Sequence, residues 1–240
     1  MQLFRKDRPL VRGVDLIAPS FALLKQHIWP VLYLGFIPGL IATMGLVLTG
    51  AQDAVPGQPL PLTDRTATGL LLVLLGAIWS GLAFPGLLVL QLRAIRGEDP
   101  SAMECFKEGL RHFIPLAFMA ILVVFLIFMG LIALMIPGLI LIRGFYLAQF
   151  YLIDQNLDPV KALRKSYADS KPNAGFIWET IGIAVMFAFI GYFFGKLPVV
   201  GYILSLAAGY IFLFGPALRY GEITESLKHP LQTNPEDRRP

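Results

Sequence analysis

Charged residues are scarce in this sequence, at 15% of the 240 positions. A soluble domain carries about 25%. Hydrophobic residues reach 56%, so most side chains cannot face water, and a membrane is the solvent that fits. The single cysteine, Cys105, excludes an intramolecular disulfide.

Catalytic signatures are missing as well. The sequence has no G-x-S-x-G elbow, no P-loop and no H-E-x-x-H zinc motif. Its three histidines are isolated from one another and lack metal-ligand spacing. These absences favour a non-enzymatic protein and give no reason to expect catalytic residues, a cofactor or a metal.

Six apolar blocks run through the chain, most of them as long as a membrane-crossing helix. They cover residues 29–50, 69–91, 114–136, 139–153, 176–194 and 198–218. The sequence therefore predicts an all-α polytopic membrane protein, with residues 1–224 as one six-span domain. Residues 225–240 are polar and contain three prolines, which is typical of a disordered tail.

Lysine and arginine alternate along the connections between these blocks. Five precede the first block, four lie in the second connection, four in the fourth and four after the sixth, Arg219 among them. The first and fifth connections hold one each, and the third, Pro137-Gly138, holds none. By the positive-inside rule, this pattern predicts six crossings of a bacterial inner membrane with both termini in the cytoplasm.

Three short amphipathic stretches precede pairs of blocks, and we expect them to lie as helices in the cytoplasmic headgroup layer. Two begin with Asp-Pro, at Asp99-Pro100 and Asp158-Pro159, which predicts an N-capping aspartate before a first-turn proline. Their predicted apolar faces are Ile17, Phe21, Leu24 and Ile28; Met103, Phe106, Leu110 and Phe113; and Val160, Leu163 and Tyr167. Basic residues on the opposite faces either anchor the bundle or recognise anionic lipid headgroups. The headgroup candidates are Arg93, Arg96, Lys161, Arg164 and Lys165.

Arg143 is a charged residue inside the fourth block. A charge at bilayer depth costs roughly 2.5 to 3.5 kcal/mol, so it needs a polar partner or a watery cavity. Its nearby polar candidates in the bundle are Tyr146, Gln149 and Gln91, and two carboxylates, Asp154 and Glu179, lie at the boundary. Arg143 either bonds free carbonyls or outer headgroups, or holds a lipid phosphate or an anionic substrate.

Proline and glycine recur where helices are expected. The candidate helix breaks are Pro38, Pro85, Pro137, Gly138 and Pro216. Broken helices build the midplane sites of transporters, but they are also common where neighbouring helices bond the freed groups. Rows of small residues, such as Gly201, Ser205 and Gly209, indicate close packing within the chain or an interface with a second copy or another membrane protein.

Two segments of the second half share a recognisable pattern. Ile136-Pro-Gly-Leu-Ile-Leu-Ile-Arg143 leads to Ile153-Asp154 and then to Leu157-Asp-Pro-Val-Lys-Ala-Leu-Arg-Lys-Ser166. This pattern resembles the YciC-like bacterial inner-membrane proteins and the related membrane domain fused to some glycerophosphodiester phosphodiesterases. The resemblance is clearest over residues 130 to 180. It implies that Pro137, Gly138, Arg143 and Ser166 occupy recurrent positions, and it implies no reaction.

These observations favour an inner-membrane protein that handles or senses lipid or a small amphiphile, or supports envelope homeostasis. Membrane lipids are then its expected partners, and nucleic acid is not expected. The alternatives are a membrane scaffold or assembly subunit and a small-solute transporter. A polar cavity between spans would favour the lipid-handling or transport hypothesis, and a filled bundle with an exposed apolar face would favour the scaffold.

Overall fold

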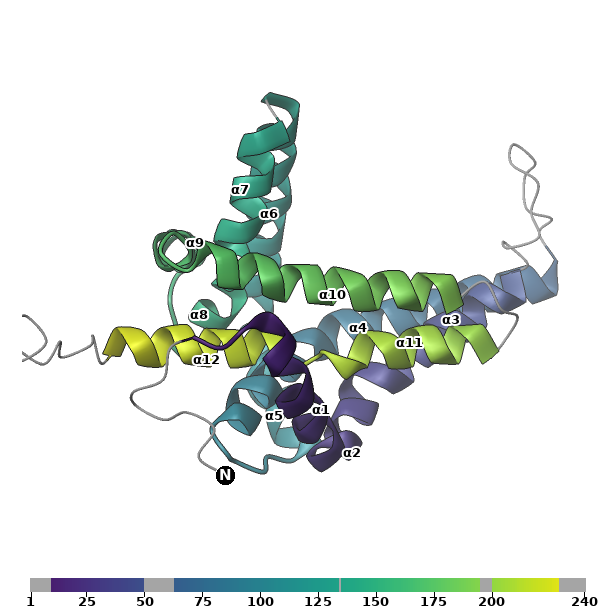
Figure 1. The fold of residues 1–240 in the computed structure, drawn as a ribbon. Helices are drawn as coiled ribbons and strands as arrows, with labels where there is room; N and C mark the ends of the chain where they lie inside the picture. The colour runs from purple at the N-terminus through teal and green to yellow at the C-terminus, as the bar shows by residue number, and fades with distance from the viewer. Residues whose placement is uncertain (1–9, 50–62, 134, 195–199, 229–240) are drawn as a thin grey trace, which may run out of the picture.

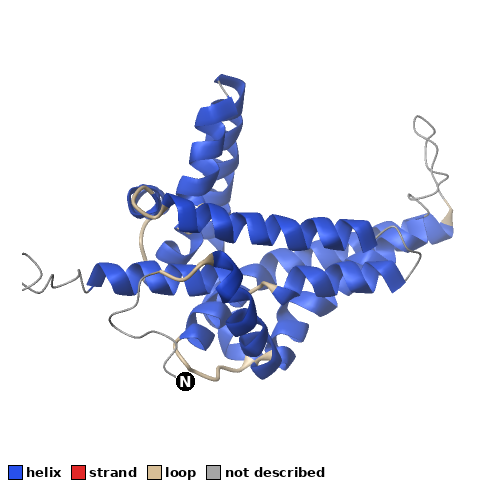
Figure 2. Cartoon of the chain, viewed as in Figure 1, coloured by secondary structure: helices blue, strands red, loops and turns tan. Residues whose placement is uncertain are grey.

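The computed structural model describes residues 10–49, 63–133, 135–194 and 200–228, and every regular element among them is helical (Figures 1 and 2). Two short elements, η1 (Gly13–Leu16) and the π-helical η2 (Leu32–Phe36), accompany the α-helices. The first half contains α1 (Ile17–Gln26), α2 (Ile28–Val31), α3 (Ile37–Thr49), α4 (Asp64–Ile95), α5 (Ala102–Arg111) and α6 (Phe113–Ala133). The second contains α7 (Met135–Phe145), α8 (Ala148–Asp154), α9 (Pro159–Ser170), α10 (Ala174–Phe194), α11 (Val200–Ile211) and α12 (Gly215–Lys228).

Within the described residues, five helical segments are long and apolar enough to cross a membrane. They are Ile28–Thr49, Asp64–Ile95, Phe113–Ile132, Met135–Asp154 and Ala174–Phe194. The sixth predicted block differs from the expectation. Its described part is α11, of 12 residues, after which the chain turns at Phe212, Leu213 and Phe214 and begins α12.

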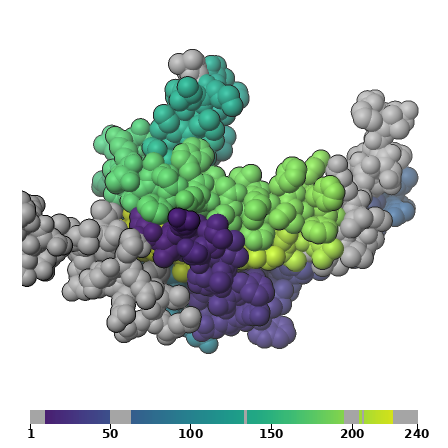
Figure 3. Space-filling model, in the orientation of Figure 1, coloured from purple at the N-terminus to yellow at the C-terminus, as the bar shows by residue number. Residues whose placement is uncertain are grey.

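The long helices form three hairpins, in which α3 packs on α4, α6 on α7 and α10 on α11. In Figure 1, α3, α4, α10 and α11 run side by side, whereas α6 and α7 rise from one end of them in a different direction. Helices α1, α5, α8, α9 and α12 gather at that end, which we call the junction. The N-terminal segment is seated against α10 there (Figure 3).

Glycines allow the α3–α4 hairpin to close tightly. A Cβ added at Gly45 would lie 2.6 Å from the carbonyl oxygen of Gly69, and one at Gly76 would lie 2.6 Å from the backbone nitrogen of Ala42. Helices pack this closely in membranes because dispersion contacts replace the hydrophobic driving force. The small-residue rows expected in the sixth block contribute less. Gly191 of α10 approaches Ser205 of α11, but nothing lies within 4 Å of a Cβ built at Gly209.

The turn predicted at Pro137-Gly138 is misplaced, because both residues lie in the first turn of α7. Proline is tolerated there since the first turn of a helix has no internal acceptor for its N–H groups. Helix α4 runs through Pro85 without interruption, and Pro38 follows the π-helical turn η2 inside one continuous span. Pro216 lies in the first turn of α12, directly after the interruption of the sixth block.

The three amphipathic stretches form α1, α5 and α9. Apart from two leucines, the buried residues on them are small or polar: Ser20 and Leu23 in α1, Cys105 and Gly109 in α5, and Ala162, Leu163, Ser166 and Ser170 in α9. Five of the eleven residues of the predicted apolar faces are exposed, namely Phe21, Ile28, Met103, Leu110 and Val160, whereas Leu163 is buried and Ile17, Leu24 and Phe106 pack against the core. Small side chains let these helices approach the junction, and part of each predicted apolar face is left facing outward.

The predicted helix starts are correct in one of two cases. Asp158 is the N-cap residue of α9 and Pro159 its first residue, although the Asp158 carboxylate pairs with Lys161 and caps no N–H group. Helix α5 begins at Ala102, two residues later than the predicted first residue, Pro100. Its N-cap is Ser101, whose hydroxyl accepts from the Glu104 N–H at 3.3 Å while Glu104 accepts in return from the Ser101 N–H, a capping box.

Candidate functional site

The most deeply buried charge in the described chain is Arg219, on α12 at the junction, whose side chain has no exposed surface. Its Nε donates to Thr180 Oγ1 at 3.0 Å, and its Nη1 donates to Glu222 Oε2 at 2.7 Å. The guanidinium lies 5.4 Å from the ring centre of Phe176. Its Nη2 has no hydrogen-bond partner among the described residues. Two elements, α10 and α12, therefore hold one buried cation.

Two carboxylates accompany this cation. Glu222 lies beside it and is largely buried, and the exposed Glu179 of α10 accepts from the Gly13 N–H at 2.8 Å. Burial raises the pKa of Glu222 to about 7, against the opposing influence of Arg219 and of the Val11 N–H. Burial likewise lowers the pKa of Arg219, which Glu222 and Glu179 oppose. Arg219 thus joins α10 to α12, and Glu179 joins the N-terminal segment to α10.

A second polar network lies beside it, around Asp154 at the end of α8. Tyr220 Oη donates to Asp154 Oδ2 at 2.6 Å, and Arg96 forms an ion pair with the same carboxylate. Gln155 donates to Tyr220 Oη at 3.3 Å and accepts from Lys165 Nζ at 2.7 Å. Asp154, one of the two carboxylates considered as partners of Arg143, therefore bonds Arg96 and Tyr220 instead.

Most of the five predicted headgroup residues pair with other side chains of the protein, and one is exposed without such a partner among the described residues. Arg93 pairs with Glu108 and with Glu98, and Arg96 with Asp154. Lys161 pairs with Asp158 at 2.8 Å in solvent, and Lys165 bonds Gln155. Arg164 is exposed and makes no hydrogen bond or ion pair within the described part of the chain. Most of these cations therefore connect helices, which leaves fewer of them for lipid than the sequence suggested.

The four residues proposed for a pocket at Arg143 are not joined to one another. Arg143 is half-buried in α7, and its buried Nε has no hydrogen-bond partner among the described residues. Tyr146 follows α7, Gln149 lies in α8, and Gln91 is buried in α4. Across the described residues, no hydrogen bond links any two of these four side chains. The predicted polar pocket is not assembled by hydrogen bonds.

The stretch that carries the family resemblance has a structural role at this point. Ser166 of α9 is buried, and its hydroxyl donates to the Gly144 carbonyl at 2.7 Å. A Cβ added at Gly144 would lie 2.4 Å from the Tyr167 ring. Helix α9 is thereby held against the end of α7, one residue beyond Arg143.

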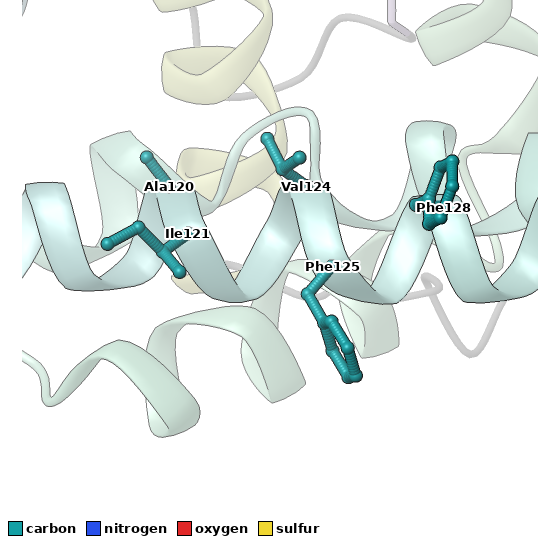
Figure 4. Close-up of a pocket in the computed structure, with 5 residues that line it drawn as sticks. All are labelled: Ala120, Ile121, Val124, Phe125 and Phe128. Atoms are coloured by element: carbon teal, nitrogen blue, oxygen red, sulfur yellow. The ribbon is translucent and has the colours of Figure 1, made fainter.

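Two hollows open on the surface. One, of about 460 Å³, lies along α6 and is lined only by apolar residues: Ala120, Ile121, Val124, Phe125 and Phe128 (Figure 4). The other, of about 530 Å³, lies where the end of α4 meets α5 and is lined only by charged residues and a histidine: Arg93, Glu104, Lys107, Glu108, Arg111 and His112. Both are open to the surface, and only the second offers groups that can recognise a polar ligand.

No known protein family, curated protein or solved structure matches this chain. Its own geometry is therefore what bears on function.

Sequence reasoning missed the Arg219 cluster. In the sequence, Arg219 is one of the four basic residues after the sixth block and served only to predict the topology. Glu179 was considered only as a partner of Arg143. One local signal was present, since Arg219 and Glu222 are three residues apart and so share a helix face. Their burial could not be read from that spacing, because Thr180 and Gly13 are supplied by distant segments.

Proposed function

We propose that this chain is a multi-pass protein of the bacterial inner membrane that binds phospholipid at the headgroup layer and catalyses no reaction. The observation that carries the proposal is the pairing on α5 of exposed apolar and charged side chains. Met103 is 51% exposed and Leu110 39%, and Lys107 and Arg111 are exposed on the same short helix. In water such apolar exposure is unfavourable, whereas at a membrane interface it is satisfied by acyl chains and the charges by headgroups.

The same arrangement recurs on α1 and α9. Phe21 and Ile28 are exposed beside Lys25, and Val160 is exposed beside Lys161 and Arg164. All three helices surround the junction, where the long apolar helices meet (Figure 1). A protein that lies in the headgroup layer at this end would present three lipid-facing surfaces from one side of the membrane.

The topology proposed with this function has six crossings and cytoplasmic termini, and α11 forms part of the sixth. The α6–α7 hairpin points away from the other long helices in Figure 1. For all six segments to cross a flat bilayer, this hairpin must turn until it runs alongside them. Membership of the YciC-like family belongs to the same proposal and rests on the residues between 130 and 180.

A second candidate function, a membrane scaffold, is favoured by α6. Ile121, Val124 and Phe128 are each at least 60% exposed along this helix. Acyl chains would cover such a face, and so would a neighbouring membrane protein. The transporter hypothesis has less support, because Arg143, Tyr146, Gln149 and Gln91 share no hydrogen bond within the described residues.

The proposed topology predicts the labelling of three introduced cysteines. Asp64→Cys is expected to react with an impermeant maleimide from outside intact cells, and Lys171→Cys and Thr233→Cys only after the inner face is opened. The native Cys105 is expected to react little with the maleimide, because it is buried and burial raises the pKa of its thiol to about 11. External labelling of Lys171→Cys would exclude four crossings before that residue, and external labelling of Thr233→Cys would exclude the sixth.

The proposed function predicts that gently solubilised protein retains phospholipid. Replacing Met103 and Leu110 together with serine is expected to reduce retention several-fold in native mass spectrometry, because roughly 1 kcal/mol of apolar contact is lost per half-exposed side chain. The matched control is Met44→Ser with Leu46→Ser on α3, the same residue types at 58% and 45% exposure. Equal retention by both variants would contradict the role of α5, and a retained protein subunit in place of lipid would favour the scaffold.

A further inference from the structure

The charged hollow between α4 and α5 combines both signs of charge within one small space. Lys107 and Arg111 lie one turn apart on α5, and Glu104 and Glu108 alternate with them on the same face. Arg93 enters from α4, and His112 follows directly after α5. Four potential cations and two carboxylates therefore line about 530 Å³.

Internal pairing leaves particular groups of this hollow free. Arg93 is held by Glu108 and, at 3.7 Å, by Glu98. Glu104 accepts the Ser101 N–H at 3.2 Å, which fixes the carboxylate at the start of α5. Lys107 and Arg111 form no ion pair or hydrogen bond within the described residues. The hollow therefore offers two uncommitted cations beside a carboxylate that is already positioned.

The backbone holds this hollow in shape. Helix α5 lies directly on α4, since a Cβ added at Gly109 would be 2.3 Å from the Gly86 nitrogen. The charged face of α5 is consequently kept at the end of α4 whether or not a ligand is bound. Such a preformed arrangement lowers the ordering cost of binding.

The apolar neighbours of the hollow indicate an amphiphilic ligand. Met103 and Leu110 are exposed on α5, and Ile114, at the start of α6, is 78% exposed. From there the apolar surface of α6 continues with Phe118 and Ile121, which are 52% and 68% exposed. A ligand whose charged end occupies the hollow would thus have its apolar part beside an apolar helix.

We propose that this hollow binds the headgroup of a zwitterionic aminophospholipid, an inference that rests on the proposed function and names its lipid. The phosphate contacts Lys107 and Arg111, and the ammonium contacts Glu104 and Glu108. Arginine and lysine are the side chains that bind phosphate, through a fork of donors and a point charge respectively. An anionic headgroup without an amine would place its negative charge beside two carboxylates, Glu104 and Glu108, with no cation of its own to offset them.

The test measures which lipid the full chain retains. Protein solubilised from membranes of equal parts phosphatidylethanolamine and phosphatidylglycerol is compared by native mass spectrometry with its variants. The unmodified chain is expected to retain phosphatidylethanolamine preferentially. Lys107→Gln with Arg111→Gln is expected to lower retention of both lipids, by about fivefold for each charge removed. Glu104→Gln is expected to lower phosphatidylethanolamine retention and to shift the ratio toward phosphatidylglycerol.

Matched controls separate this site from general surface charge and from the proposed function. Arg12→Gln with Arg65→Gln removes two exposed positive charges that lie outside α1, α5 and α9 and is expected to leave the lipid ratio unchanged. An unchanged ratio in Glu104→Gln would overturn the zwitterionic assignment, and unchanged retention in the Lys107 and Arg111 variant would overturn the hollow as the site. In both outcomes phospholipid is still retained and the proposed function stands, whereas a chain that retains none contradicts that function itself.

Soluble phosphoethanolamine distinguishes a lipid from a free phosphate compound. It carries the same charged groups but lacks acyl chains, so it is expected not to displace bound lipid at matched concentration. Displacement would assign the hollow to a soluble phosphorylated amine and overturn the lipid proposal. All replaced residues are exposed and fill no core position, and thermal unfolding of each variant verifies that the fold is kept.

Discussion

Replacing Arg219 with leucine is expected to lower the free energy of unfolding by about 3 to 5 kcal/mol. The reason is electrostatic. Removal of the guanidinium leaves Glu222, whose side chain is only 14% exposed, without its ion partner. It also removes the donor to Thr180 and the opposite charge that acts on Glu179. Thermal unfolding in mild detergent measures the effect.

The double variant shows whether a stranded charge causes this loss. Arg219→Leu combined with Glu222→Leu is expected to be more stable than Arg219→Leu alone, because no buried carboxylate is left unpaired. The control is Lys161→Leu, which breaks an ion pair whose two side chains are each 70% exposed. Its melting temperature is expected to stay close to that of the unmodified chain. Equal losses in the two single variants would contradict the argument from burial.

The cost of Arg219→Leu is also expected to depend on pH. The pKa of Glu222 is raised to about 7 from 4.5, so the folded chain holds this proton more tightly than the unfolded chain does. The stabilisation from that proton is complete below about 4.5 and is lost as pH rises through about 7. Without Arg219 the pKa rises further, so the variant is expected to recover part of its stability at pH 5.

Replacing Gly109 with alanine is expected to lower the free energy of unfolding by about 3 kcal/mol, because the new methyl group meets backbone. A Cβ there would lie 2.3 Å from the Gly86 nitrogen and 2.7 Å from its Cα. Neither atom can rotate away, so α5 must shift off α4 and take the charged hollow with it. Thermal unfolding measures the loss, and lipid retention by the folded fraction measures the displacement of α5.

The matched control for this variant is Gly81→Ala on α4, the helix against which Gly109 of α5 packs. Nothing lies within 4 Å of a Cβ built at Gly81, so alanine is expected to leave stability unchanged or to raise it through its better helix propensity. Similar melting temperatures for Gly81→Ala and Gly109→Ala would contradict the close approach of α4 and α5.

Much of the fold was predictable because it follows from local composition. An apolar run of about twenty residues forms a helix in a membrane, since each backbone group bonds within its own segment. This reasoning correctly predicted an all-helical chain with several apolar helices. It was less accurate near the ends of the blocks. Pro137 looked like a turn and is a first-turn helical residue, and the block at 198–218 is divided between α11 and α12.

The candidate sites depended on packing between distant segments, and there prediction was weaker. Arg143 was chosen because a charge inside an apolar block is conspicuous, and its Nε is buried without a hydrogen-bond partner among the described residues. Asp154, expected nearby, bonds Arg96 and Tyr220 instead. Met103 and Leu110 were expected on the apolar face of an interfacial helix, and which face of α5 meets α4 was not predicted; Gly109 and Cys105 pack there and leave Met103 and Leu110 exposed.

The sequence by itself determined that the chain is built from helices apolar enough for a membrane, because hydropathy and backbone hydrogen bonding act within single segments. Only the tertiary structure decided which charges are buried, which are paired and which remain free. Arg219 is buried because α10 and the N-terminal segment close over it, and Lys107 and Arg111 are free because Glu108 is already occupied by Arg93. Burial and pairing are relations between segments far apart in the chain, so no local pattern contains them.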